Sequence, residues 1–119
     1  MTGIELIAEE RKRQIEVEGW TSEHDDMHND GQLAKAAACY ALDLRYPIPK
    51  NSKHGRPFLF WPWPARWWKP TPDNRVRELV KAGALIAAEI DRLNRLETNF
   101  DDLLLKSVET QVKEELKLF

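Results

Sequence analysis

The sequence predicts a mainly α-helical, small single domain of about four helices, interrupted by one long loop rich in tryptophan and proline. Three observations support this prediction. The chain has 119 residues, the size of a single domain. Apolar residues recur at three- and four-residue intervals over most of its length. All seven prolines, in contrast, fall between Pro47 and Pro72, where they exclude a helix and leave room for a short β element at 58–61.

The first predicted helix begins at Thr2. Thr2 and Glu5 have the spacing of a capping box, in which each side chain accepts a hydrogen bond from the other residue's backbone. Apolar residues follow at helical spacing, and Gly19 ends the helix. Trp20 comes directly after this stop.

A polar segment, 21–30, separates the first helix from the second and is predicted to be a loop. Asp30 is expected to cap the second helix, and Pro47 to end it. The apolar face of this helix is predicted to consist of Leu33, Ala36, Ala37, Tyr40 and Leu44. Its many alanines favour a helix and allow close packing.

Asp73 is predicted to cap the strongest helix of the chain. A stripe at helical spacing follows, formed by Val76, Leu79, Val80, Gly83, Ile86, Ala87, Ile90 and Leu93. Glycine at position 83 costs about 1 kcal/mol relative to alanine, so it is expected to mark the close approach of another element.

A polar break at 97–99 is predicted to divide the chain into a helical domain, 1–96, and a C-terminal amphipathic helix, 97–119. The terminal helix is expected to pack either on its own domain or on a second copy of the chain. A homo-oligomer formed through this helix is therefore one predicted assembly.

Composition excludes several classes of protein. The single cysteine, Cys39, excludes an internal disulfide framework and favours a reduced, cytoplasmic setting; its alanine-rich surroundings predict a core position. No apolar run approaches the roughly 20 residues of a membrane span, so no membrane partner is expected. The net charge of −2 argues against general nucleic-acid binding. No glycine-rich phosphate loop or nucleophile motif is present, so we predict no catalytic residue and no cofactor.

The main functional indication is an aromatic and cationic patch. Residues 45–81 carry nine Lys/Arg and two acidic residues, a formal charge of 9 − 2 = +7, so the remainder of the chain carries −9. Four of the five tryptophans lie between Pro57 and Pro72. Indole rings stack on bases and cations neutralise phosphate, so this composition favours a small nucleotide-like anion as the ligand.

The candidate ligand-binding residues follow from this patch. The candidate stacking residues are Trp20, Trp61, Trp63, Trp67 and Trp68. The candidate phosphate partners are Arg66, Lys69, Arg75 and Lys81. The alternative is that the tryptophans cover the end of a helical core. Because Trp67 and Trp68 are adjacent, one is expected to face inward and the other outward.

A cluster of histidines and acids at 23–30 suggests two further roles. His24 and Asp25 are predicted to read the base or ribose of the ligand. Alternatively, His24, Asp25, Asp26 and His28 bind a divalent metal in a metal-dependent nucleotide hydrolase. A polar loop whose aspartates form turns and caps is the simpler interpretation, and we assign no metal site.

The helical carboxylates do not match the metal-binding pattern of helical nucleotide pyrophosphohydrolases. That pattern is Glu-Glu-x-x-Glu followed later by Glu-x-x-Asp. Here Arg13 stands where the last Glu of the first motif is expected, and Arg92 where the Asp is expected. The acids of these helices, among them Glu10 and Glu89, are therefore interpreted as solvated helix faces.

Two stretches resemble the ryanodine-receptor repeat domain, which also occurs as a free-standing module in bacteria and phages. One is Ile-Glu-Val-Glu-Gly-Trp at 15–20. The other is Leu-Phe-Trp-Pro-Trp at 59–63, followed by Lys69, Asp73, Arg75 and Leu-Val-Lys at 79–81. The helix expected at 30–46 and the Trp67–Trp68 pair have no counterpart in that family.

The chain is also similar to short phage and prophage proteins. The shared segments are Glu-Gly-Trp-Thr, Glu-His-Asp-Asp-x-His, Ala-Ala-Cys-Tyr-Ala and Leu-Val-Lys-Ala-Gly-Ala-Leu-Ile. These resemblances imply a non-enzymatic phage protein in the host cytoplasm that sequesters a nucleotide or cyclic nucleotide used as a host immune signal. A third alternative is an interaction module whose tryptophans anchor a host protein.

Overall fold

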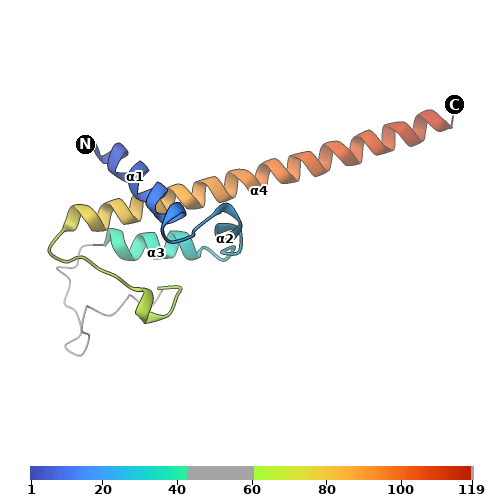
Figure 1. Cartoon of the computed structure of the whole chain (residues 1–119). Helices are drawn as coiled ribbons and strands as arrows, with labels where there is room; N and C mark the ends of the chain where they lie inside the picture. The colour runs from blue at the N-terminus through green and yellow to red at the C-terminus, as the bar shows by residue number, and fades with distance from the viewer. Residues whose placement is uncertain (43–60, 119) are drawn as a thin grey trace.

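The computed structural model describes residues 1–42 and 61–118. Its elements, in order, are α1 (Gly3–Glu16), α2 (Ser22–Asp26), α3 (Gln32–Ala41), the 3-10 turn η1 (Ala65–Trp67) and α4 (Arg75–Lys117). The predicted mainly α fold with four helices is confirmed, and the described residues contain no strand (Figure 1). Most of the predicted short strand at 58–61 lies outside the described residues.

The core forms where α3 packs antiparallel against the first half of α4. Leu33 and Leu85 are fully buried there, and small residues such as Ala36, Ala82 and Ala88 allow the two helices to approach closely. The predicted face of α3 is confirmed from Leu33 to Tyr40; Leu44 and Pro47 lie outside the described residues. Cys39 is buried, as predicted.

Helix α1 lies across α4, and Gly83 makes this crossing possible. A β-carbon at position 83 would stand 2.5 Å from Cδ1 of Ile7, so the expected close approach at this glycine is confirmed. The capping box between Thr2 and Glu5 is also confirmed. Gly19 adopts a left-handed φ of +76°, which turns the chain from α1 toward Trp20.

Several predicted boundaries are wrong. Asn74, rather than Asp73, caps α4 by accepting a hydrogen bond from the backbone of Arg77. Gly31, rather than Asp30, is the N-cap of α3. Segment 21–30 contains a short helix, α2, because the Thr21 side chain accepts from the backbone of His24. The predicted break at 97–99 does not exist, because α4 continues through it.

The buried face of α4 is not the stripe that its sequence emphasises. Val80, Ala82, Leu85 and Ala88 are buried, whereas most of the large residues of the predicted stripe are about half exposed.

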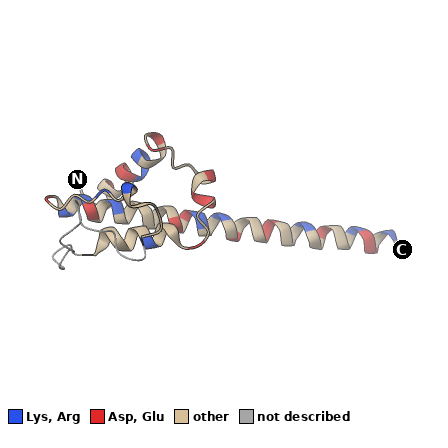
Figure 2. Cartoon of the chain, turned by 90° about the horizontal axis from the view of Figure 1, so that it is seen from below, with Lys and Arg blue, Asp and Glu red and all other residues tan. Residues whose placement is uncertain are grey.

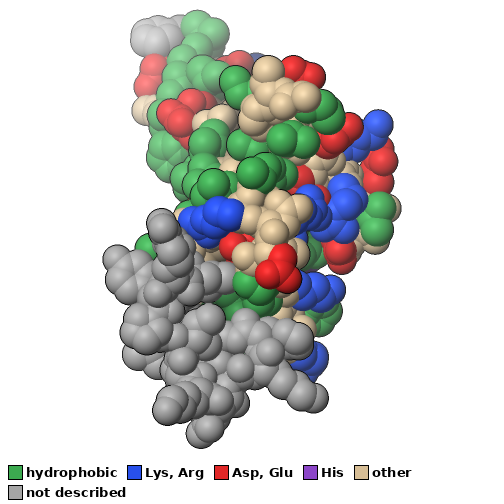
Figure 3. Space-filling model, turned by 90° about the vertical axis from the view of Figure 1, so that its left-hand side faces the viewer, with side chains coloured by type: hydrophobic (Ala, Val, Ile, Leu, Met, Phe, Trp, Pro, Cys, Tyr) green, Lys and Arg blue, Asp and Glu red, His purple; other side chains and the backbone are tan. Residues whose placement is uncertain are grey.

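The described acidic and basic residues are spread over α1 and both halves of α4 (Figure 2). Seen end-on, hydrophobic side chains form a band along one side of the molecule (Figure 3).

The second half of α4 projects far beyond the packed helices (Figure 1). All described residues from Leu96 onward are exposed. The radius of gyration is 20.1 Å, compared with about 13–14 Å for a compact domain of this length. The chain is therefore a small helical domain with a long helical extension.

Candidate ligand-binding pocket

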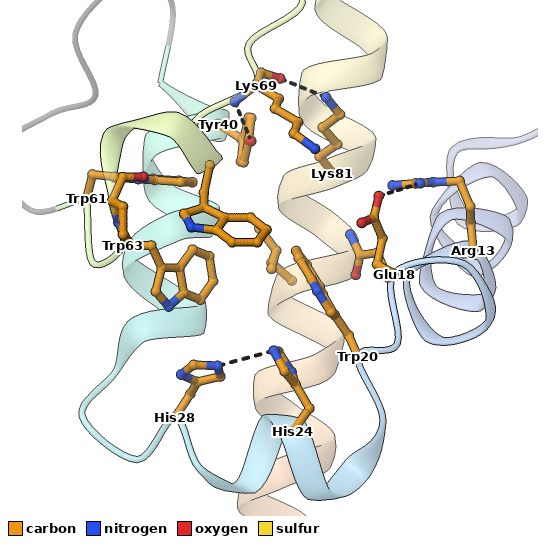
Figure 4. A pocket seen from close by; sticks show the side chains of 14 residues that line it. Arg13, Glu18, Trp20, His24, His28, Tyr40, Trp61, Trp63, Lys69 and Lys81 are labelled. Carbon is orange, nitrogen blue, oxygen red and sulfur yellow. Dashed lines mark hydrogen bonds and ion pairs between the residues drawn. The ribbon is translucent and has the colours of Figure 1, made fainter.

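A cavity of about 400 Å³ lies between the end of α1, α2, the end of α3, the η1 loop and α4 (Figure 4). This volume is within the usual range of small-molecule sites. The lining residues are Arg13, Gln14, Glu18, Trp20, His24, His28, Tyr40, Trp61, Trp63, Pro64, Trp67, Lys69, Lys81 and Leu85.

Aromatic rings form one wall of the cavity. Trp63 contacts the other three rings of this wall. The distance between ring centroids is 5.4 Å to Trp61, 6.1 Å to Trp20 and 5.4 Å to His28. The rings come from the η1 loop and from the turn after α1, two segments distant in sequence. Trp20, Trp61 and Trp63 are half-buried and also pack against the core, so the rings are held in place both by one another and by the core.

Two histidines form the floor of the cavity: His24 lies in α2, and His28 follows it, with its backbone N–H bonded to the carbonyl of Asp25. Nδ1 of His24 donates to the buried carboxylate of Asp25 at 3.0 Å, and Asp25 also pairs with Arg11. This contact leaves Nε2 of His24 3.4 Å from Nε2 of His28. Burial, followed by the proximity of His24, lowers the pKa of His28, so the His28 ring favours the neutral form.

Two lysines stand at the opposite end of the cavity. The Lys81 ammonium donates to the backbone carbonyl of Lys69 at 2.8 Å and lies 5.4 Å from the centroid of the Tyr40 ring. Burial is the main cause that lowers the pKa of Lys81, and Arg77 lowers it further. No carboxylate forms an ion pair with Lys81 within the described residues, so its charge can meet an anion.

A third wall comes from α1, where a buried amide has an unused acceptor. Gln14 is 2% exposed and lines the cavity. Its Nε2 donates to Glu10 at 3.4 Å, which orients the amide, and its Oε1 has no hydrogen-bond partner within the described residues. Buried polar atoms are rarely left unpaired, so this oxygen is a natural acceptor for a ligand N–H or O–H.

Ion pairs around Glu10 support this wall. Glu10 is buried and pairs with Arg13 at 2.6 Å and with Arg77 of α4 at 2.9 Å. Burial alone would raise the pKa of Glu10, but these two arginines outweigh it and lower the pKa. The prediction that the helical carboxylates are solvated is wrong for Glu10, and also for Glu89, which pairs with Arg92 at 2.6 Å.

The structure brings together seven of the eleven candidate residues. Those that line the cavity are Trp20, His24, Trp61, Trp63, Trp67, Lys69 and Lys81. The lining residues not predicted from the sequence include Gln14, Glu18, His28 and Tyr40. Gln14 had no sequence signal, because a single glutamine in a helix is indistinguishable from a surface residue.

The other four candidates, Asp25, Arg66, Trp68 and Arg75, do not line the cavity. Trp68 is 5% exposed and stacks on Tyr40, so it belongs to the core, whereas Trp67 is 49% exposed. The inward–outward alternation of this pair is therefore confirmed. Arg66 lies over the outer indole, that of Trp67. Asp25 is sealed beneath His24 by its pair with Arg11.

Arg75 closes the end of α3. Its guanidinium donates to the carbonyls of Tyr40 at 3.0 Å, Leu42 at 2.9 Å and also Ala41. These carbonyls are the unpaired acceptors that every helix leaves at its C-terminus. The guanidinium is occupied by this contact, and it does not line the cavity.

The carboxylates of the 23–30 cluster are engaged elsewhere. Asp26 pairs with Arg95 of α4 at 2.8 Å, which ties α2 to the long helix. Within the described ranges, no group of three or more His, Cys, Asp or Glu side chains is arranged to hold a metal ion. The metal-dependent alternative stays a prediction.

Comparison of the chain with family models, with curated proteins and with solved structures finds no match in any of the three. The resemblances described above therefore stay predictions. None of the described helices is long and apolar enough to cross a membrane.

Proposed function

We propose that this protein binds a small nucleotide-like anion, such as a nucleotide or cyclic nucleotide, without transforming it. One observation carries the proposal: a single cavity combines aromatic walls, two lysines and a buried amide oxygen without a partner. The aromatic walls fit a heterocycle, the two lysines fit a phosphate, and the amide oxygen fits an N–H on the heterocycle.

Each part of the cavity has a defined role in this proposal. The rings of Trp20 and Trp63 stack on the base, a contact that contributes about 1–3 kcal/mol per base. Lys81 and Lys69 receive the phosphate as point charges. Gln14 accepts from an N–H on the edge of the base, which satisfies its orphan oxygen.

Retention of the ligand is also part of the proposal. The carboxylates of Asp25 and Asp26 are engaged by Arg11 and Arg95, and the proposal includes no cleavage step. A protein that binds an immune nucleotide signal and holds it without cleaving it acts by sequestration, which is the role implied by the phage resemblance. We adopt this role as the working hypothesis.

The test is thermal unfolding and calorimetry with a panel of nucleotides and cyclic dinucleotides. A ligand at about 100 times its dissociation constant is expected to stabilise the fold by about 2.7 kcal/mol. Lys81→Met and Gln14→Met are expected to lose this stabilisation, since they remove the phosphate partner and the acceptor. Lys12→Met is the matched control, because Lys12 is exposed on α1 and does not line the cavity.

The identity of the recovered ligand decides between sequestration and catalysis. Intact ligand after heating supports binding alone, whereas cleaved ligand with loss of cleavage in chelator supports the hydrolase. If no member of the panel binds by either method, the proposal is wrong and the tryptophan surface is better tested against proteins.

A further inference from the structure

Helix α4 carries a second apolar face whose large side chains are about half exposed or more, and which α1 reaches at Gly83, where Ile7 packs. Leu79 is 46% exposed, Ile90 is 52% exposed and Phe100 is 65% exposed, although all are large and apolar. The α4 stripe, as we call this face, consists of Val76, Leu79, Ile86, Ile90, Leu93, Phe100, Leu104, Val108, Val112 and Leu116. It is separate from the core face, which contains Leu85 and Ala88.

The spacing of the α4 stripe is that of a helix-pairing seam. Positions 76, 83, 90, 97 and 104 alternate with 79, 86, 93 and 100 in steps of three and four residues, the a and d pattern of a heptad repeat. Gly83 and Glu97 are the exceptions. Beyond 104 the apolar residues continue in steps of four, so the seam runs through both halves of the helix.

The projecting half of α4 needs a partner on physical grounds. Residues 97–117 form about six turns that are exposed throughout and project beyond the packed helices (Figure 1), and isolated helices of this length are marginal in water. Apolar side chains exposed on all these turns add to the cost. A partner helix along the whole seam would remove on the order of 1,000 Å² per copy from water, the size of a specific interface.

Formal charges indicate what the partner is. Residues 75–96 carry five basic and three acidic residues, 5 − 3 = +2, whereas residues 97–117 carry three basic and six acidic, 3 − 6 = −3. Two copies paired in parallel place −3 beside −3 and +2 beside +2. Two antiparallel copies place +2 beside −3 twice, and their helix dipoles are also opposed.

We propose that two copies of this chain pair antiparallel through the α4 stripe. The projecting half of each helix then covers the exposed stripe beside the domain of the other copy. This arrangement is isologous, so it closes at two copies. The ligand-binding cavity lies on another face of α4, lined by Lys81 and Leu85, so each copy keeps its own site.

The first experiment measures the mass of the full-length chain in solution by light scattering and sedimentation. The expected result is a dimer at micromolar concentration. Phe100→Glu places a charge in the stripe and is expected to give a folded monomer. Thr98→Glu adds the same charge two residues away, off the stripe, and is expected to remain a dimer.

The second experiment tests the orientation of the pair. A nitroxide label on Lys113→Cys lies 17 residues from position 96, the midpoint of the stripe. At 1.5 Å per residue the two labels of an antiparallel dimer stand about 50 Å apart, and those of a parallel dimer less than about 20 Å apart. The native Cys39 is buried, and unmutated protein serves as the labelling blank.

A monomer at high micromolar concentration, a short label distance or a larger assembly would each overturn the proposal. Circular dichroism of Phe100→Glu checks that the helical domain remains folded, so that a monomer is not confused with unfolded protein. Because neither readout involves a nucleotide, failure here leaves the proposed ligand binding untouched.

Discussion

Ile7 of α1 occupies the space that a side chain on Gly83 of α4 would need. Its Cδ1 and Cγ1 atoms stand 2.5 Å and 2.8 Å from the β-carbon position of residue 83. The two helices therefore cross at a glycine in the third turn of a 43-residue helix, even though glycine inside a helix is unfavourable for the helix itself.

Gly83→Ala is expected to lower the free energy of unfolding by about 1 kcal/mol net. Overpacking against Ile7 costs about 1–3 kcal/mol, which outweighs the gain of about 1 kcal/mol in helix propensity. In an Ile7→Ala background the sign reverses, because the space is then open and only the propensity gain remains. Urea unfolding of the four proteins in this double-mutant cycle measures both effects.

The adjacent tryptophans 67 and 68 are expected to respond very differently to removal. Trp68→Ala should cost about 3–5 kcal/mol, because its ring is buried against Tyr40 with centroids 4.7 Å apart. Trp67→Ala should cost under about 1 kcal/mol, since half of that side chain is exposed. Chemical unfolding compares the two variants, and equal losses would contradict the assigned orientations.

Arg75 is expected to stabilise the fold rather than bind a ligand. Arg75→Met removes the donors to three carbonyls at the end of α3, so we expect a loss of about 1–3 kcal/mol. Arg66→Met is the matched control, because Arg66 is exposed over Trp67, and it should cost little. Stability of Arg75→Met equal to that of the control would argue against this helix cap.

His28 is expected to make stability depend on pH. Its pKa in the folded protein is lowered, first by burial and then by His24, relative to about 6.5 in the unfolded chain. The unfolded state therefore binds the proton first. The free energy of unfolding that neutral His28 contributes is therefore fully present above about pH 6.5. It is lost as the pH falls toward the lower pKa of His28 in the folded protein.

His28→Gln should therefore lose less stability than the parent between pH 7.5 and 5.5. Met27→Gln is the control, because Met27 is exposed next to it and does not titrate. Melting curves at several pH values measure the difference. The same pH dependence in all three proteins would exclude His28 as its source.

The positions of the helices could be predicted well, because helix caps and apolar spacing depend on residues close together in the sequence. The Thr2–Glu5 cap, the buried face of α3 and the tight approach at Gly83 all depend on residues within a few positions or on the absence of a side chain. Helix ends were less predictable. The end of α3 is closed by Arg75, which lies more than thirty residues away in the sequence.

The types of residue that line the candidate pocket could be predicted, but not which individual residues line it. Tryptophans and lysines at 61–81 indicated an aromatic, cationic site, and seven candidate residues do line one cavity. Gln14 could not be found in this way. Its oxygen is notable only because α1 places it in the cavity without a partner, a fact that depends on packing.

The sequence by itself determined the class of fold, the start of the first helix and the chemical character of the loop, because propensity, capping and composition act over short distances. Tertiary structure decided which apolar face of α4 became the core. Alanines at 82 and 88 let α3 approach that side, while the larger residues of the α4 stripe stayed outside. Close packing favours the helix face whose shape fits its neighbour, even where another face is more apolar. The α4 stripe was therefore left outside the core.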